Sequence, residues 1–122
     1  MQKLFLFLFF TPTILLAQSL DVLFIGNSYT YANNMPQMVS ELALSFGDTL
    51  NFESSTPGGA TFNTHSTNIN TLNKISQKPW DYVVLQAQSQ EPSFSPNQVA
   101  NDVFPYAQII IDSIESNSTC TE

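Results

Sequence analysis

The stretch DVLFIGNSYT, residues 21–30, decides the fold that we expect for this chain. Its first half, residues 21–26, is a short apolar run closed by a glycine. This pattern is typical of a strand that is buried on both faces of a parallel sheet. The second half is polar and begins with Asn27 and Ser28. The sequence therefore predicts a buried strand that ends in a polar loop.

Two later segments repeat this arrangement of a strand followed by a polar loop. Residues 49–54 alternate weakly between polar and apolar side chains, and residues 81–86 are rich in β-branched and aromatic side chains. Both patterns favour strands. A pair of glycines, Gly58 and Gly59, lies in the loop after the second strand, and the loop after the third is rich in glutamine.

Helical patterns separate and follow these predicted strands. Apolar residues recur at helical spacing over residues 35–46, with a proline near the start and Gly47 as the stop. Residues 61–77 are polar but carry spaced apolar side chains, and we expect one helix there. A last helix is expected to begin at Ser95 and to be kinked at Pro105.

The alternation of strands and helices predicts an α/β fold. We expect a parallel sheet with helices on both faces, in a three-layer α/β/α arrangement. Residues 18–122 are expected to form one domain. Because three strands are few for a sheet covered on both faces, we expect these residues to be the N-terminal part of a larger domain that is incomplete at its C-terminus.

The first 17 residues differ in composition from the rest of the chain. Lys3 supplies a positive charge, residues 4–16 are mainly apolar, and Ala17 offers a small residue for cleavage. This is the layout of a secretory signal peptide, and the apolar run is shorter than the roughly 20 residues that span a bilayer. We therefore expect residues 1–17 to be a cleaved signal, a secreted or periplasmic protein, and no stable membrane anchor after cleavage.

The composition excludes several classes of function. Lys and Arg total 3 against 10 Asp and Glu, the net charge is −7, and there is no arginine. Such a chain lacks the basic surface needed for nucleic acid. The single His and the single Cys, Cys120, show no metal-ligand spacing, and no glycine-rich phosphate loop is present. The missing phosphate loop disfavours a flavodoxin-like nucleotide or flavin binder, and we expect no metal and no cofactor.

Three chemically unusual loops are expected to meet at one edge of the sheet. Parallel α/β sheets hold their ligands at the carboxyl ends of the strands. The loops at those ends are residues 26–30, 55–60 and 86–92. Together they contribute a serine hydroxyl, a glycine backbone and a cluster of side-chain amides to that edge.

The order of these loops resembles the motif blocks of the SGNH/GDSL serine hydrolases over about residues 21–95. Residues 22–30, VLFIGNSYT, are similar to the first block in its Gly-Asn-Ser variant. Gly58 or Gly59 matches the glycine of the second block. The third block usually reads Gly-x-Asn-Asp, whereas this chain has Gln-Ala-Gln-Ser at residues 86–89, a pattern that resembles one poorly characterised bacterial branch of the superfamily.

The resemblance implies a role for each of these residues. Ser28 is the expected nucleophile, since it matches the serine of the first block. The oxyanion formed on attack would be held by the N–H of Ser28, the N–H of Gly58 or Gly59, and the side-chain amide of Gln88. Neighbouring side chains are expected to contact substrate: Asn27, Tyr29 and Ser89.

The same residues also have purely structural interpretations. Asn27 and Ser28 are a common pair for capping a following helix. Gly58 and Gly59 are equally compatible with an ordinary loop. Gln88 would then only satisfy buried backbone groups, as most buried amides do.

The base of a catalytic triad is not apparent in this chain. The resemblance implies a His in an Asp-x-x-His block near the C-terminus of the complete domain. The only His here is His65, which precedes the third block and has Phe62 three residues before it. We expect His65 to be a polar surface residue and the catalytic His to lie beyond these residues.

Two functions of different classes are compatible with the sequence. The favoured one is a secreted hydrolase that cleaves acyl esters, with carbohydrate and lipid O-acyl groups as candidate substrates and with the fragment alone inactive. The alternative is a noncatalytic carbohydrate-binding or surface protein on the same scaffold. Its polar loop residues would hydrogen-bond sugar hydroxyls.

Overall fold

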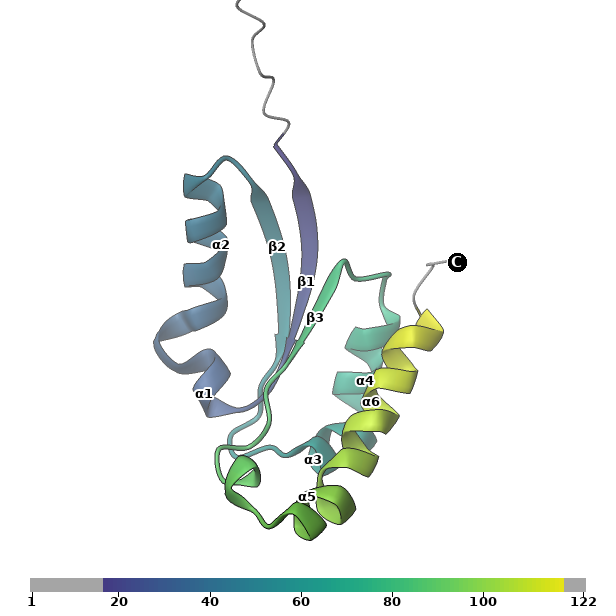
Figure 1. Ribbon diagram of the computed structural model, residues 1–122. Coiled ribbons are helices and arrows are strands. Elements are labelled where there is room, and N and C mark those ends of the chain that lie inside the picture. The colour runs from purple at the N-terminus through teal and green to yellow at the C-terminus, as the bar shows by residue number, and fades with distance from the viewer. Residues whose placement is uncertain (1–16, 118–122) are drawn as a thin grey trace, which may run out of the picture.

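A computed structural model describes residues 17–117, and in this part of the chain three strands form one parallel sheet (Figure 1). The strands are β1 (Ser19–Ile25), β2 (Thr49–Ser55) and β3 (Tyr82–Leu85). Their order is β2-β1-β3, so that β1 is central. β1 pairs with β2 over its whole length and with β3 over its second half. All three carboxyl ends therefore lie at the same edge.

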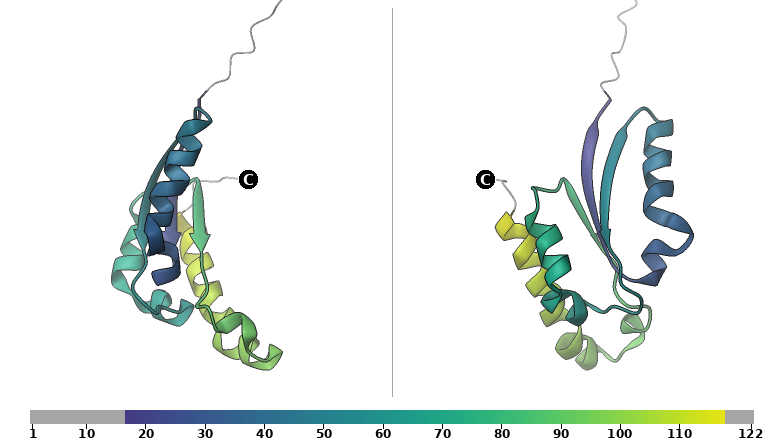
Figure 2. Two further views of the ribbon diagram at one scale, coloured as in Figure 1. Left: turned by 90° about the vertical axis from the view of Figure 1, so that its left-hand side faces the viewer. Right: turned by 180° about the vertical axis from the view of Figure 1, so that it is seen from behind.

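Helices cover both faces of the sheet, as predicted, in a three-layer α/β/α arrangement (Figures 1 and 2). The short α1 (Ser28–Tyr31), a 3₁₀ turn at Ala32–Asn34 and α2 (Met35–Ser45) lie on one face. The other face carries four helices, of which α6 is the longest: α3 (Phe62–Thr67), α4 (Ile69–Ser76), α5 (Pro96–Asp102) and α6 (Phe104–Asn117). A further 3₁₀ turn, Glu91–Ser93, precedes α5.

The hydrophobic core lies between the sheet and the layer of α3 to α6. Leu23 and Ile25 of β1 are fully buried there, because alternate residues of a strand point to the same face. The layer opposite adds four more buried side chains to this cluster, three from helices and one from the residue between α5 and α6: Phe62, Ile75, Ile110 and Val103. Residues 22–26 are all buried, which confirms the prediction of a strand buried on both faces.

Two of the predicted helices are each divided in two. The helix expected over residues 61–77 is interrupted at Asn68, whose side chain accepts hydrogen bonds from the N–H groups of Asn70 and Thr71. Asn68 thereby starts α4, because an Asn side chain competes with helical backbone bonding. The helix expected from Ser95 ends at Asp102 and resumes at Phe104, so the kink expected at Pro105 is a full break at Val103, with Pro105 in the first turn of α6. A proline is well accommodated only in a first turn.

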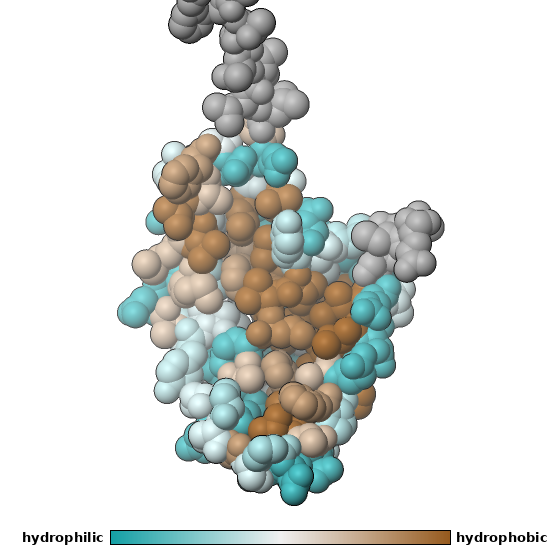
Figure 3. Space-filling model, in the orientation of Figure 1, coloured by the Kyte–Doolittle hydropathy of each residue, from teal (hydrophilic) through white to brown (hydrophobic). Residues whose placement is uncertain are grey.

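The α2 layer is much more open than the layer opposite. Met38 and Leu42 on α2 and Phe46 directly after it are exposed. Tyr82 and Val84 are exposed on the same side of β3. Figure 3 shows this apolar surface in brown on the face that carries α2 and β3. None of the described helices is long and apolar enough to cross a membrane. Apart from Ala17, the predicted signal peptide lies outside the described residues, and so does Cys120.

Candidate active site

Hydrogen bonds tie the three loops together at the carboxyl edge of the sheet. The side-chain oxygen of Gln86, directly after β3, accepts from the backbone N–H of Asn27 at 2.9 Å and from the hydroxyl of Thr30 at 2.9 Å. The side-chain amide of Asn27 donates to the carbonyl of Ala60, in the loop after β2, at 3.1 Å. Asn27 is therefore the point at which all three loops meet.

Gly26 permits the close approach of these loops. A Cβ atom at this position would lie 2.7 Å from the side-chain oxygen of Gln86 and closer still to the hydroxyl of Thr30. Both groups are needed for the hydrogen bonds just described. A side chain at Gly26 would thus force Gln86 and Thr30 away from the first loop.

Ser28 is the first residue of α1, at the point where β1 gives way to a helix. Asn27 is the N-cap, since its side-chain oxygen accepts from the N–H of Tyr29 at 3.1 Å, and the capping interpretation of Asn27 is confirmed. Asn27 is 1% exposed and both ends of its amide are engaged, so it positions the loop.

The hydroxyl and the N–H of Ser28 have no hydrogen-bond partner among residues 17–117. Ser28 is partly exposed and lines a shallow surface depression with Tyr29 and Ala32. Tyr29 is 68% exposed beside it. A nucleophile in this position is accessible and is not already committed to another group.

Gly58 and Gly59 form an exposed turn between β2 and α3. Gly59 has a positive φ of 71°, a conformation that favours glycine. The turn is closed by the N–H of Ala60, which donates to the carbonyl of Pro57 at 3.2 Å. In the part of the chain described, neither glycine N–H donates to another group, so both are available to a ligand.

Gln88 lies in the loop after β3 and is held from two sides. Its backbone N–H donates to the carboxylate of Glu91 at 2.8 Å, and its side-chain oxygen accepts from the N–H of Gln90 at 2.6 Å. The side-chain NH₂ of Gln88 has no partner among residues 17–117. Ser89, next to it, is exposed. The predicted oxyanion donor is therefore oriented and unoccupied.

The structure thus places the predicted residues on neighbouring loops but joins them only indirectly. Within residues 17–117, no hydrogen bond connects Ser28 to either glycine or to Gln88. The contacts between loops are made by Asn27 and Gln86. A substrate oxygen would have to bridge the donors on the three loops.

The prediction that His65 is a polar surface residue is wrong, because His65 is completely buried. Its Nε2 lies 2.8 Å from the carbonyl oxygen of Gly26, and its Nδ1 lies 2.9 Å from the hydroxyl of Thr71. The Thr71 hydroxyl in turn lies 2.8 Å from that of Ser55. A buried imidazole is tolerated here because both of its nitrogens are hydrogen-bonded.

The chemistry of these partners fixes the direction of each hydrogen bond. The carbonyl of Gly26 can only accept, so Nε2 of His65 carries a proton. Burial lowers the pKa of His65, opposed by the hydrogen bond to Gly26, so at neutral pH the ring is uncharged and Nδ1 accepts. Thr71 then donates to Nδ1 and accepts from Ser55.

This arrangement rules out His65 as the base for Ser28 in the described geometry. Both ring nitrogens are occupied, and neither contacts the Ser28 hydroxyl. The expectation that the catalytic base is another residue therefore stays a prediction. The described residues contain no group of three or more His, Cys, Asp or Glu side chains able to hold a metal ion.

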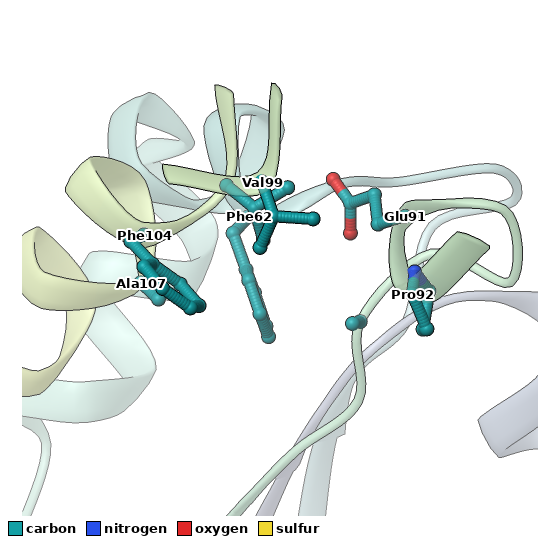
Figure 4. Close-up of a pocket in the computed structure, with 8 residues that line it drawn as sticks. Phe62, Glu91, Pro92, Val99, Phe104 and Ala107 are labelled. Carbon is teal, nitrogen blue, oxygen red and sulfur yellow. The ribbon is translucent and has the colours of Figure 1, made fainter. Parts of the chain in front are cut away.

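An apolar cavity of about 260 Å³ lies beside the loop after β3. Figure 4 shows Phe62, Val99, Phe104 and Ala107 around it, with Glu91 and Pro92 at its other side. Glu91 is 5% exposed, and its carboxylate is the group that holds the N–H of Gln88. Glu91 therefore both lines the cavity and holds the backbone of Gln88.

The residues that assemble this site could not be identified from the sequence. Its pattern gives Gln86 a place in the third motif but no role, and it does not single out Thr30, Ser55 or Thr71. Each contact depends on a partner that is distant in the sequence, such as Asn27 for Gln86. The only available signal is the presence of uncharged polar residues at strand ends.

Comparison with protein-family models, with curated proteins and with solved structures finds no match to this chain.

Proposed function

We propose that this protein is a secreted serine hydrolase that cleaves acyl esters, with Ser28 as its nucleophile. The observation that carries the proposal is the position of Ser28 at the end of the central strand, with its hydroxyl and N–H free among the described residues. The order of the motifs, which resembles that of the SGNH/GDSL hydrolases, supports the same function.

In this proposal the Ser28 oxygen attacks the ester carbonyl carbon and its proton passes to a general base. The tetrahedral intermediate collapses, the alcohol leaves with a proton, and an acyl-serine remains. Water then attacks the acyl-serine and releases the acid. A serine hydroxyl needs the base for this chemistry, and the proposal assigns that role to a residue other than His65.

Three free donors are available for the oxyanion. They are the N–H of Ser28, the N–H of Gly58 or Gly59, and the side-chain NH₂ of Gln88. Such donors are effective because they are fixed before the reaction, and removing one typically costs about 10²- to 10³-fold in rate. Glu91 and Gln90 fix the Gln88 donor.

The proposed substrate is uncharged near the scissile bond. In the loops at residues 26–30, 55–60 and 86–92 the one acidic or basic side chain is that of Glu91, which is 5% exposed and already accepts from the N–H of Gln88. Tyr29 offers an exposed aromatic surface next to Ser28, and Ser89 offers a hydroxyl. An ester of a carbohydrate or a lipid fits these surroundings better than a phosphate or a charged peptide.

The test is hydrolysis of a short-chain aryl ester by the protein as its gene encodes it, compared with Ser28→Ala. We expect the rate to fall by about 10³-fold or more in the variant, since the triad serine is lost. Ser45→Ala is the matched control, because it removes an exposed hydroxyl at the end of α2, outside the three loops of the site. Equal rates for the wild type and Ser28→Ala would refute the proposal.

One observation favours the noncatalytic alternative, a carbohydrate-binding protein. No base contacts Ser28 among residues 17–117. The same experiment separates the two functions when it is combined with glycan binding measured by calorimetry. Binding that survives in Ser28→Ala, with no ester hydrolysis by the wild type, would support the alternative.

A further inference from the structure

The candidate site leaves one buried, titratable side chain without a role. His65 is 0% exposed and does not reach the nucleophile, yet it makes two short hydrogen bonds, one to Gly26 directly after β1 and one to Thr71 of α4. A histidine that only filled space would be replaceable by an apolar residue. The carbonyl that His65 contacts belongs to Gly26, two residues before Ser28.

The contact with Gly26 acts on the peptide that leads into the nucleophile loop. The carbonyl oxygen of Gly26 accepts from His65, while the N–H of the same peptide plane, on Asn27, donates to Gln86. Both ends of this plane are thus held by side chains from other elements. Because hydrogen bonds on the two ends of one amide polarise each other, each strengthens the other.

Holding this peptide plane also constrains the two residues after it. The plane sets the direction in which the chain enters Asn27, and Asn27 caps α1 and binds the carbonyl of Ala60. Ser28 is the next residue, and its hydroxyl and N–H have no hydrogen bond to a described residue. The orientation of Ser28 therefore depends on the held peptide and on the cap.

His65 is itself held in a single tautomer. Thr71 donates to its Nδ1 and accepts a hydrogen bond from the hydroxyl of Ser55, so the proton of the neutral ring lies on Nε2, facing Gly26. Thr71 is fully buried and Ser55 nearly so. We call this series of hydrogen bonds the orienting chain. It runs from β2 through α4 and α3 to the residue after β1, and it uses no charged group: Ser55, Thr71, His65 and Gly26.

We propose that His65 is a positioning residue for Ser28, acting through the Nε2–H bond to the Gly26 carbonyl and the Gly26–Asn27 peptide. This inference rests on the proposed function of Ser28. His65 does not take a proton from the nucleophile. Its contribution is to hold the serine in the orientation required for attack, and misplacement by about 1 Å can cost roughly 10²-fold in rate.

Two variants separate positioning from a merely structural role. His65→Gln places a side-chain NH₂ where Nε2 lies and keeps a donor for the Gly26 carbonyl. His65→Asn is one bond shorter and reaches only the position of Nδ1, so it retains a partner for Thr71 but loses the contact to Gly26. Both remove the imidazole, and both leave a polar amide at the same site.

The experiment measures kcat and KM for aryl ester hydrolysis, per folded molecule, in the wild type, His65→Gln and His65→Asn. We expect His65→Asn to lower kcat by about 10²-fold with little change in KM. His65→Gln is expected to restore most of that loss. Equal kcat values for His65→Asn and the wild type, or an equal loss in both variants, would overturn the proposal.

Two further measurements keep the test decisive if His65→Asn does not fold. Nitrogen-15 NMR of the wild type should show that Nε2 of His65 is protonated and Nδ1 is unprotonated. The opposite tautomer would overturn the proposal. Thr71→Val keeps the shape of the threonine but removes the hydroxyl that orients the ring. We expect it to lower kcat, by less than His65→Asn does, and an unchanged kcat would contradict the orienting chain.

Failure of the proposed function gives a different result from failure of this inference. A wild type that hydrolyses no ester, or that is unaffected by Ser28→Ala, overturns the proposed function and the role of His65 with it. A wild type that depends on Ser28 but is insensitive to His65→Asn overturns the role of His65 alone.

Discussion

The two ends of the sheet are held together by opposite kinds of contact. At the amino end, Asp21 pairs with Lys78 at 2.8 Å, with both side chains 34% exposed. Lys78 also lies over the ring of Trp80. At the carboxyl end the contacts are neutral and largely buried, and they join the side chains of Asn27 and Gln86 to groups on neighbouring loops.

This difference predicts at which end of the sheet a substitution destabilises the fold more. An exposed ion pair adds little stability, because water screens the charges and the long side chains lose entropy. A buried polar group that loses its partner costs its full desolvation free energy. The carboxyl end, which carries the candidate site, should therefore respond to substitution much more strongly than the amino end.

The largest effect is expected from Gly26→Ala. The added Cβ would displace Gln86 and Thr30, which breaks two hydrogen bonds and overpacks a buried site. We expect the free energy of unfolding to fall by about 3 kcal/mol or more. Urea unfolding followed by circular dichroism measures this.

Gly58→Ala is the matched control for that substitution. No atom lies within 4 Å of a Cβ added at Gly58, and its φ is not positive. Its stability should stay within about 0.5 kcal/mol of the wild type. A similar loss in both variants would show that Gly26 is not a special point of close approach.

A smaller loss is expected from Gln86→Leu. The substitution keeps the bulk of the side chain but removes the acceptor for the N–H of Asn27 and the hydroxyl of Thr30. Leaving these groups unpaired should cost about 1–3 kcal/mol. Gln90→Leu, at an exposed position of the same loop, is the control. An equal loss at both positions would show that the hydrogen bonds of the Gln86 side chain do not stabilise the carboxyl end of the sheet.

The sequence predicted the framework of this edge but not the contacts that assemble it. The burial of β1 on both faces was predictable because residues 22–25 are uniformly apolar, and the position of Ser28 is set by where that run ends. The burial of His65 was not, because its partner Gly26 is 39 residues away. Local patterns describe a strand or a helix, whereas this network depends on three loops meeting in space.

The division of the predicted helices has a similar explanation. Apolar spacing over residues 61–77 is compatible with one helix, but the Asn68 side chain bonds the backbone ahead of it and starts a second one. This break is what allows His65 on α3 and Thr71 on α4 to face each other. The feature that sequence spacing missed is thus one that the candidate site requires.

Stability should also depend on pH through His65. Burial lowers its pKa in the folded protein below the unfolded value of about 6.5, and its hydrogen-bond partners are neutral. As the pH falls below about 6.5, the unfolded chain binds this proton first, so stability declines until the folded-state pKa is reached. Above about pH 6.5 the contribution is constant.

His65→Gln tests this dependence because it removes the titrating group and keeps the donor to Gly26. We expect the wild type to lose stability between about pH 7 and about pH 5 with a steeper slope than the variant. Urea unfolding at several pH values measures both slopes. Identical slopes would show that His65 takes up its proton equally well when the protein is folded.

The smallest effect is expected from removing a partly exposed ion pair between β2 and α4. Lys74 lies 2.6 Å from Glu53, with side chains 33% and 31% exposed, and its hydrogen bond lowers the pKa of Glu53. Glu53→Gln should therefore cost less than about 1 kcal/mol at neutral pH, measured by urea unfolding.

Acid and salt should both reduce the difference between the wild type and Glu53→Gln. The pair contributes above the unfolded pKa of Glu53, about 4.3, and this contribution is lost as the pH falls through the lower folded value. The two proteins should accordingly converge in acid, and high salt should narrow their difference at neutral pH. A loss as large as that of Gln86→Leu would mean that the two kinds of contact hold the sheet equally firmly.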